Sequence, residues 1–227
     1  MEKWDACSFA VNPDELEGRV CYGGLDLSST TDITAFVLVF PPQDEDDKYA
    51  ILPYFWVPED TLELRVRRDH VPYDVWERQG FLQTTEGNVV HYGYIEKFIE
   101  RLGEKYNIRE IAFDRWGAVQ MVQNLEGMGF TVVPFGQGFK DMSPPTKELM
   151  KLTLEERLAH GGHPVLRWMM DNIYIRTDPA GNIKADKEKS TEKIDGAIAT
   201  IMGLDRAIRC GNDTGASVYD DRGILFI

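Results

Sequence analysis

Three aspartates stand where an apolar run gives way to polar or small residues, and each is a candidate metal ligand. Asp26 lies in GGLDLSST, Asp114 ends IAFD, and Asp195 lies in KIDGA. A carboxylate at the end of a buried strand costs free energy to desolvate unless it is paired or binds a cation. Three such carboxylates at one place would repel one another, and divalent cations would offset that repulsion. The pattern therefore predicts a metal site.

The ligand type indicates which chemistry this site would perform. Carboxylate oxygens suit Mg²⁺ and Mn²⁺, and two such ions about 3.5–4 Å apart can activate water and stabilise the leaving oxygen of a phosphodiester. We predict that Asp26 bridges both ions, that Asp114 completes one site and that Asp195 completes the other. Each aspartate alone has an ordinary interpretation as a turn residue or helix cap, so the prediction depends on all three. Asp32 is a weaker candidate for an outer ligand.

The hydrophobic pattern predicts the elements that must position these aspartates. Three strands with short connections come first, followed by helices, then two strands joined by a helix, and finally an amphipathic helix. The expected strands are 20–27, 33–40, 49–57, 108–113 and 130–134, with a short one at 173–176. The expected helices are 59–68, 73–79, 92–106, 118–128, 146–158, 165–171 and 194–208.

This order is typical of an α/β ribonuclease H-like fold, with a five-stranded mixed sheet of three antiparallel and then two parallel strands, flanked by helices. In that architecture the first strand is central and the fourth runs parallel beside it, so their carboxyl ends face one crevice. The small residues Gly196, Ala197 and Ala199 would let the final helix approach the sheet closely. We expect one domain over residues 1–210 and a C-terminal tail over residues 211–227.

Composition narrows the possible functions. The 227 residues are 43% hydrophobic and 28% charged, which is typical of a globular domain. We expect no membrane segment, because no apolar run approaches the roughly 20 residues that span a bilayer, and we expect no signal peptide. Three cysteines without CxxC spacing predict neither zinc nor disulfides and fit a reducing cytoplasm. The net charge of −13 argues against a simple basic DNA-binding face.

Several further groups have weaker interpretations. Lysines 184, 187, 189 and 193 lead into Asp195 and are candidates for steering phosphate, although acidic residues are interleaved with them. The pair His160 and His163 indicates a loop rather than a zinc site, since the two glycines between them make a poor platform. We expect arginines 65, 67 and 68 on a solvated helix face, and tryptophans 56, 76, 116 and 168 mostly in the core.

The chain resembles the nuclease domain of the large terminase subunit of tailed bacteriophages. Besides the three aspartate segments, the resemblance is carried in order by FWVP, VPYDVW, AFDRW and QGF. It implies a ribonuclease H-like endonuclease that cuts concatemeric viral DNA during genome packaging in the host cytoplasm. It also implies two Mg²⁺ or Mn²⁺ ions held by acidic residues, a role that falls on Asp26, Asp114 and Asp195.

The same resemblance implies partners. These are double-stranded DNA and, in complete large terminases, an N-terminal ATPase domain, the portal and the small terminase subunit. The phosphate-binding loop GxxxxGK[ST] does not occur in the sequence. We therefore expect an isolated nuclease domain that cannot hydrolyse ATP or translocate DNA by itself.

Three alternatives remain open. A transposase or junction resolvase would share the acidic triad but read particular DNA structures. An actin-like ATPase or sugar kinase is a phosphotransferase alternative, because GLDLSSTT resembles a phosphate-gripping hairpin. A catalytically inactive scaffold would bind DNA or portal without cutting. Comparing plasmid nicking with ATP hydrolysis would distinguish these classes.

Overall fold

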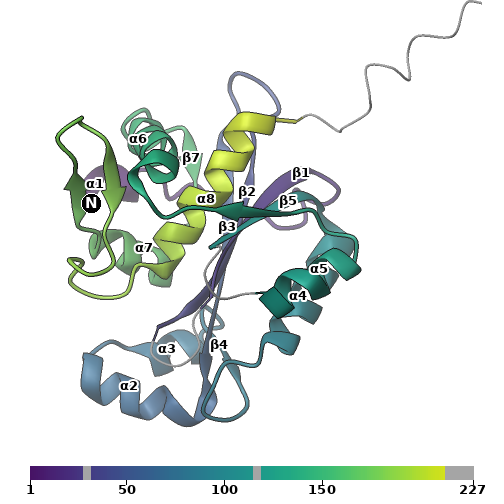
Figure 1. The fold of residues 1–227 in the computed structure, drawn as a ribbon, viewed down its shortest axis with the longest axis vertical. Coiled ribbons are helices and arrows are strands. Elements are labelled where there is room, and N and C mark those ends of the chain that lie inside the picture. The colour runs from purple at the N-terminus through teal and green to yellow at the C-terminus, as the bar shows by residue number, and fades with distance from the viewer. Residues whose placement is uncertain (28–31, 115–118, 213–227) are drawn as a thin grey trace, which may run out of the picture.

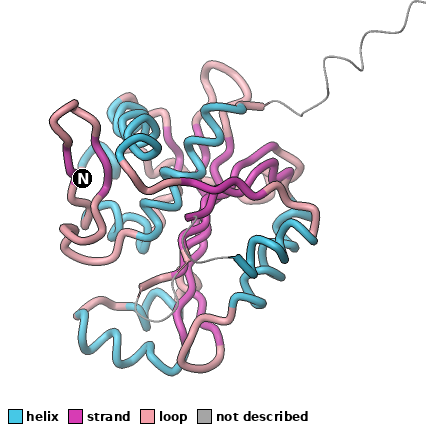
Figure 2. The backbone as a smooth tube through the Cα atoms, in the orientation of Figure 1, coloured by secondary structure: helices cyan, strands magenta, loops and turns pink. Residues whose placement is uncertain are grey.

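A mixed β-sheet runs through the centre of the molecule (Figures 1 and 2). The computed structural model describes residues 1–27, 32–114 and 119–212. Within them the sheet order is β4-β3-β2-β1-β5-β6, and β7 pairs with β3. The strands are β1 Val20–Asp26, β2 Thr34–Phe40, β3 Tyr49–Pro58, β4 Gln83–Thr85, β5 Asn107–Asp114, β6 Val132–Phe135 and β7 Leu158–Ala159.

The five predicted strands are present with the predicted directions. Strands β1, β2 and β3 pair antiparallel, whereas β5 pairs parallel with β1 and β6 pairs parallel with β5. A count of five was too low, because β4 and β7 each pair parallel with β3. These strands are three and two residues long. Segments so short carry no periodicity, so only their tertiary pairing identifies them.

Helices cover both faces of the sheet (Figure 1). Helices α4 and α5 pack on the β5–β6 side, whereas α8 lies across β1 and β2 with α6 and α7 beside it. The helices are α1 Glu2–Asp5, α2 Leu62–Asp69, α3 Tyr73–Arg78, α4 Tyr92–Lys105, α5 Val119–Gly127, α6 Phe139–Leu154, α7 Pro164–Asp171 and α8 Asp195–Cys210, with a 3₁₀ turn at Glu59–Thr61. A separate hairpin of β8 Ile175–Thr177 and β9 Ile183–Ala185 lies before α8.

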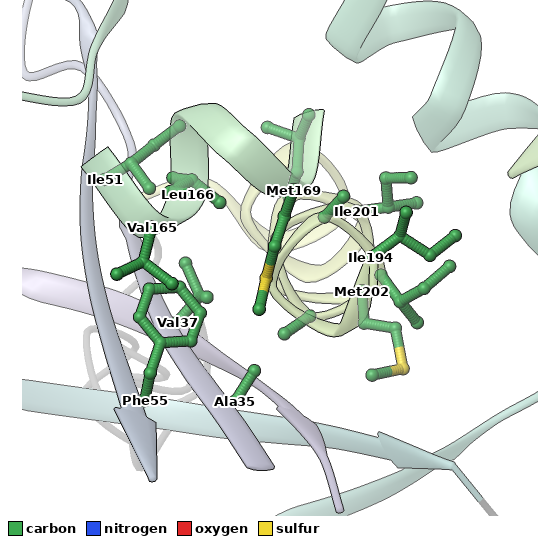
Figure 3. Packing of buried hydrophobic residues seen from close by; sticks show 14 of the residues in the cluster. Ala35, Val37, Ile51, Phe55, Val165, Leu166, Met169, Ile194, Ile201 and Met202 are labelled. Carbon is green, nitrogen blue, oxygen red and sulfur yellow. The ribbon is translucent and has the colours of Figure 1, made fainter. Parts of the chain in front are cut away.

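Strand β2 shows how two hydrophobic layers share one sheet. All seven of its residues are buried. Ala35, Val37 and Val39 face the α6–α8 layer, and the alternate residues Phe36 and Leu38 face the α4–α5 layer. Successive side chains of a strand point to opposite faces, so a strand covered on both sides is apolar throughout. Figure 3 shows the α7–α8 side of this packing.

Helix α6 begins seven residues earlier than predicted, at Phe139 instead of residue 146. The segment contains Pro144 and Pro145, which lack the backbone N–H that a helix interior uses. Burial of Met142, Pro145 and Leu149 in the layer beside α8 stabilises the helix despite the lost hydrogen bonds. The helix start predicted from the sequence was therefore wrong, because these two prolines lie inside the helix and not before it.

Some predictions concern residues outside the described part of the chain. These are Trp116, the first residue of the helix expected from residue 118, and most of the tail expected over residues 211–227. None of the helices in the described ranges is long and apolar enough to cross a membrane.

Candidate functional site

Asp26 and Asp114 end two adjacent parallel strands. In the pairing of β1 with β5, Leu25 lies opposite Phe113, and each aspartate is the next residue of its strand. Parallel strands that end together present their last side chains at one edge of a sheet. The predicted juxtaposition of these two carboxylates is therefore built into the strand register.

Asp195 reaches the same edge because α8 packs unusually close to β1. A β-carbon placed on Gly24 would lie 1.8 Å from the carbonyl oxygen of Ala199 and 2.8 Å from the backbone nitrogen of Gly203. One placed on Gly196 would lie 2.6 Å from the ring of Phe55. The expected close approach of this helix is confirmed, and Gly24 and Gly203 are further contributors to it. Glycine within a strand is the signal for such an approach.

Lys187 lies between two of the aspartates. Its Nζ is 2.6 Å from Oδ2 of Asp26 and 2.9 Å from Oδ1 of Asp195. The second oxygen of Asp195, Oδ2, accepts a hydrogen bond from the backbone N–H of Ile33 at 3.4 Å. Asp26 and Asp195 are only 3% and 2% exposed. Two buried carboxylates therefore share one ammonium group that reaches them from the segment after β9.

The electrostatics of the site follow from this burial. Desolvation raises the pKa of Asp26, and the neighbouring charges of Asp195 and Asp114 raise it further, against the opposing effect of Lys187. Desolvation likewise raises the pKa of Asp195. Burial alone would lower the pKa of Lys187, but the two carboxylates hold it above its ordinary value. The buried carboxylates thus repel one another, and Lys187 offsets part of that repulsion.

The donors suit a hard divalent cation. Oδ2 of Asp26 is buried and accepts no well-formed hydrogen bond from the described residues, so its close neighbour is the Lys187 ammonium. An oxygen in this state is available to an ion that prefers carboxylates. Among the described residues, however, no three His, Cys, Asp or Glu side chains stand in ready metal-binding geometry. Metal binding by Asp26, Asp114 and Asp195 therefore stays a prediction.

A cavity of about 300 Å³ opens beside Asp195 and Lys187. At its rim Lys193 pairs with Asp32, with 2.5 Å between Nζ and Oδ1. The charge of Asp32 also raises the pKa of Asp195, so this weaker candidate belongs to the surroundings of the site. The cavity is lined by Asp32, Lys187, Glu188, Ser190, Thr191, Glu192, Lys193, Ile194 and Asp195.

The four lysines expected near phosphate have different surroundings. Lys187 and Lys193 are each held by carboxylates, as described above. Lys189 lies over the ring of Tyr174, and Lys184 donates to the carbonyl oxygen of Gln137. The association of Lys187 with the aspartates was not apparent from the sequence.

His160 and His163 both make contacts within the fold. The ring of His160 stacks on Trp4 with 4.1 Å between centroids, and its Nε2 is 2.8 Å from the Trp4 carbonyl oxygen. His163 caps α7, because its Nδ1 accepts from the backbone N–H of Leu166 at 3.5 Å. These contacts place both histidines in the turn between β7 and α7.

The family model described as terminase large subunit, endonuclease domain, matches residues 1–210. The chain belongs to this family. It is 41% identical over 207 residues to the large terminase subunit of Enterobacteria phage HK97, and that match covers 90% of the chain and 40% of the HK97 protein. The chain therefore spans about two fifths of the length of this relative.

Solved terminase structures have the same fold. The crystal structure of the HK97 large terminase superposes with a TM-score of 0.81 at 38% identity, over 89% of the chain and 42% of the HK97 chain. The large terminase nuclease of the thermophilic phage G20c, solved with bound magnesium, gives a TM-score of 0.57 at 13% identity, over 90% of the chain and 95% of that nuclease. The ribonuclease H-like prediction for this terminase family member is confirmed.

Proposed function

We propose that this chain is the DNA-cutting part of a large terminase, an endodeoxyribonuclease that cuts concatemeric viral DNA during genome packaging in the host cell. One observation carries the proposal: Asp26 and Asp195, two buried carboxylates from β1 and α8, meet around a single cationic group. Asp114 ends the strand next to Asp26. Membership of the terminase nuclease family favours this function over a resolvase, a kinase or an inactive scaffold.

We propose that Asp26, Asp114 and Asp195 would hold two divalent ions, Mg²⁺ or Mn²⁺. When bound, such ions activate water for attack and stabilise the leaving oxygen of a phosphodiester. The G20c nuclease with bound magnesium supports the choice of metal, since it shares the fold. The burial of Asp26 and Asp195 supports the choice of ligands, because carboxylates removed from water interact strongly with a cation.

The chain itself positions and shields these groups. The register of β1 with β5 fixes Asp26 beside Asp114, and the contact of Gly24 with Ala199 fixes the distance of α8 from the sheet. The cavity beside Asp195 offers the scissile phosphate a place next to the carboxylates. In this proposal double-stranded DNA enters from the cavity side.

The remaining packaging functions belong, in this proposal, to other parts of a full-length large terminase and its complex. An ATPase domain would drive translocation, and the portal and small terminase subunit would place the DNA. Such partners would also supply DNA affinity, which a chain with a net charge of −13 provides poorly by itself.

Plasmid cleavage tests the proposal. The purified chain should nick supercoiled plasmid in Mg²⁺ or Mn²⁺ and stop when EDTA removes the metal. It should not hydrolyse ATP under the same conditions. Cleavage that continues undiminished in EDTA would exclude the metal-dependent mechanism, and ATP hydrolysis without nicking would favour the kinase-like alternative.

A further inference from the structure

The ammonium group of Lys187 lies between the two buried carboxylates Asp26 and Asp195. Its Nζ contacts one oxygen of Asp26 and one of Asp195, at 2.6 and 2.9 Å. These two carboxylates come from elements that lie far apart in the sequence, β1 and α8. A positive group at this point offsets their repulsion and helps to hold the start of α8 against the sheet.

We propose that Lys187 is a built-in counter-cation that a divalent metal ion must displace, so that this lysine sets the metal affinity of the site. The inference rests on the proposed function, because it takes Asp26 and Asp195 as metal ligands. It concerns a residue outside the proposed triad.

Competition follows from the shared oxygens. Mg²⁺ binds carboxylate oxygens at about 2.0–2.1 Å and demands near-octahedral geometry. An ammonium in contact with the same two oxygens would stand within a few ångströms of the ion, and the two positive charges would repel each other in a buried setting. Metal and ammonium therefore exclude each other from these positions.

The ion pair of Lys187 with Asp26 is buried on the carboxylate side and partly exposed on the lysine side. Oδ2 of Asp26 lies 2.6 Å from the ammonium, which also contacts Oδ1 of Asp195 at 2.9 Å. The Lys187 side chain keeps 35% of its surface exposed, so a route to the cavity is open to it.

The backbone around Lys187 is fixed, so the side chain alone has to move. Asp186 accepts hydrogen bonds from the backbone N–H groups of Glu188, at Oδ1, and Ser190, at its carbonyl oxygen, each at 3.0 Å. The Ser190 hydroxyl donates to the same carbonyl at 2.7 Å. Rotation of the Lys187 side chain toward the cavity would free both carboxylates without unfolding this turn.

Metal titration tests the inference without any cleavage assay. Isothermal titration calorimetry with Mn²⁺ is compared for the wild-type chain, Lys187→Met and the neighbouring control Lys189→Met. Removing the competing ammonium should tighten Mn²⁺ binding by Lys187→Met about tenfold or more, within the usual range of coupling between two ligands, whereas Lys189→Met should bind like the wild type. Equal or weaker Mn²⁺ binding by Lys187→Met overturns the inference.

A labelling experiment on the wild-type chain avoids dependence on the folding of a variant. An amine-reactive ester is applied with and without Ca²⁺, and modification of each lysine is measured by mass spectrometry. Ca²⁺ should increase labelling of Lys187 severalfold and leave Lys105, which pairs with Asp14 elsewhere, unchanged. Unchanged Lys187 labelling at Ca²⁺ saturation contradicts displacement.

The two proposals fail in different ways. If neither the wild type nor Lys187→Met binds Mn²⁺, the proposed metal site is wrong, and the role of Lys187 is wrong with it. If both bind Mn²⁺ with the same affinity, the proposed metal site is supported, and only the proposal that the metal displaces Lys187 is wrong. If Lys187→Met binds Mn²⁺ and the wild type does not, both the metal site and the role of Lys187 are supported.

Discussion

Gly24 and Ala199 are in direct backbone contact: a β-carbon on Gly24 would lie 1.8 Å from the carbonyl oxygen of Ala199. This contact joins the strand that ends in Asp26 to the helix that begins with Asp195. The absence of a side chain at Gly24 thus helps to set the separation of the two carboxylates, together with Gly196 and Gly203.

Gly24→Ala should therefore damage both the fold and the site. The added methyl meets backbone, so α8 must shift away from β1, and overpacking of this kind typically costs about 1–3 kcal/mol. We expect a lower free energy of unfolding in urea together with loss of nicking. The control is Gly127→Ala at the end of α5, where a β-carbon would meet nothing within 4 Å. Full stability of Gly24→Ala would show that α8 is less tightly constrained than described.

Each of Asp26→Asn, Asp114→Asn and Asp195→Asn should reduce plasmid nicking by about a hundredfold or more. Losing an outer-shell partner of a metal ligand already costs about 10–100-fold, and these residues are proposed as the ligands themselves. Circular dichroism should show an intact fold, because Asn is nearly isosteric with Asp. Asp171→Asn, on the exposed end of α7, provides the matched control. Wild-type nicking by one of the three variants would remove that residue from the proposed site.

DNA binding by this chain without metal should be weak and steeply reduced by salt. The aspartates repel phosphate, and Lys187 and Lys193 are occupied by carboxylates. Ca²⁺, used as a non-cleaving ion, should strengthen binding to a short duplex in fluorescence anisotropy by neutralising the carboxylates. Lys189→Ala should reduce the salt slope by about one if this lysine contacts a phosphate. Tight, salt-insensitive binding without metal would contradict this view.

Much of the site could be predicted from the sequence, because its ligand candidates stand at the ends of strongly apolar strands. Asp26 and Asp114 follow such runs, and the order of elements places those strands side by side. The position of Lys187 could not be predicted from the sequence. Lysines and acidic residues alternate around it, and that pattern usually indicates a solvated surface. Arg65 was placed wrongly for a similar reason. We expected it on a solvated face, yet it is buried and its Nε donates to Oγ1 of Thr61 at 3.0 Å.

His163 should make the chain sensitive to acid. Burial lowers the pKa of His163 to about 4, whereas an unfolded histidine titrates near 6.5. Between those values the unfolded chain binds more protons, so this residue's contribution to stability is present above about pH 6.5 and is lost as the pH falls toward 4. His163→Asn keeps a capping side chain but does not titrate. Between about pH 6.5 and pH 4 the free energy of unfolding, measured in urea, should fall less for His163→Asn than for the wild type. The difference between the two falls should be roughly 2 kcal/mol.

The control for this comparison is His70→Asn. His70 is exposed and has a φ of 55°, a conformation that asparagine tolerates. His70→Asn should follow the wild-type pH dependence. If His163→Asn loses as much stability on acidification as the wild type, the acid sensitivity arises from other groups.

The packing of β1 against α8 also determines when, during synthesis, the site can exist. Asp26 leaves the ribosome before Lys187 and Asp195, and most of the described elements are translated between them. Until α8 docks, one face of β1 and β2 lacks its cover, and pairing elements so distant in sequence is slow. Until then a nascent chain carries Asp26 and Asp114 without Lys187 and Asp195. The arrangement of Asp26, Asp195 and Lys187 therefore forms only when α8 folds onto β1.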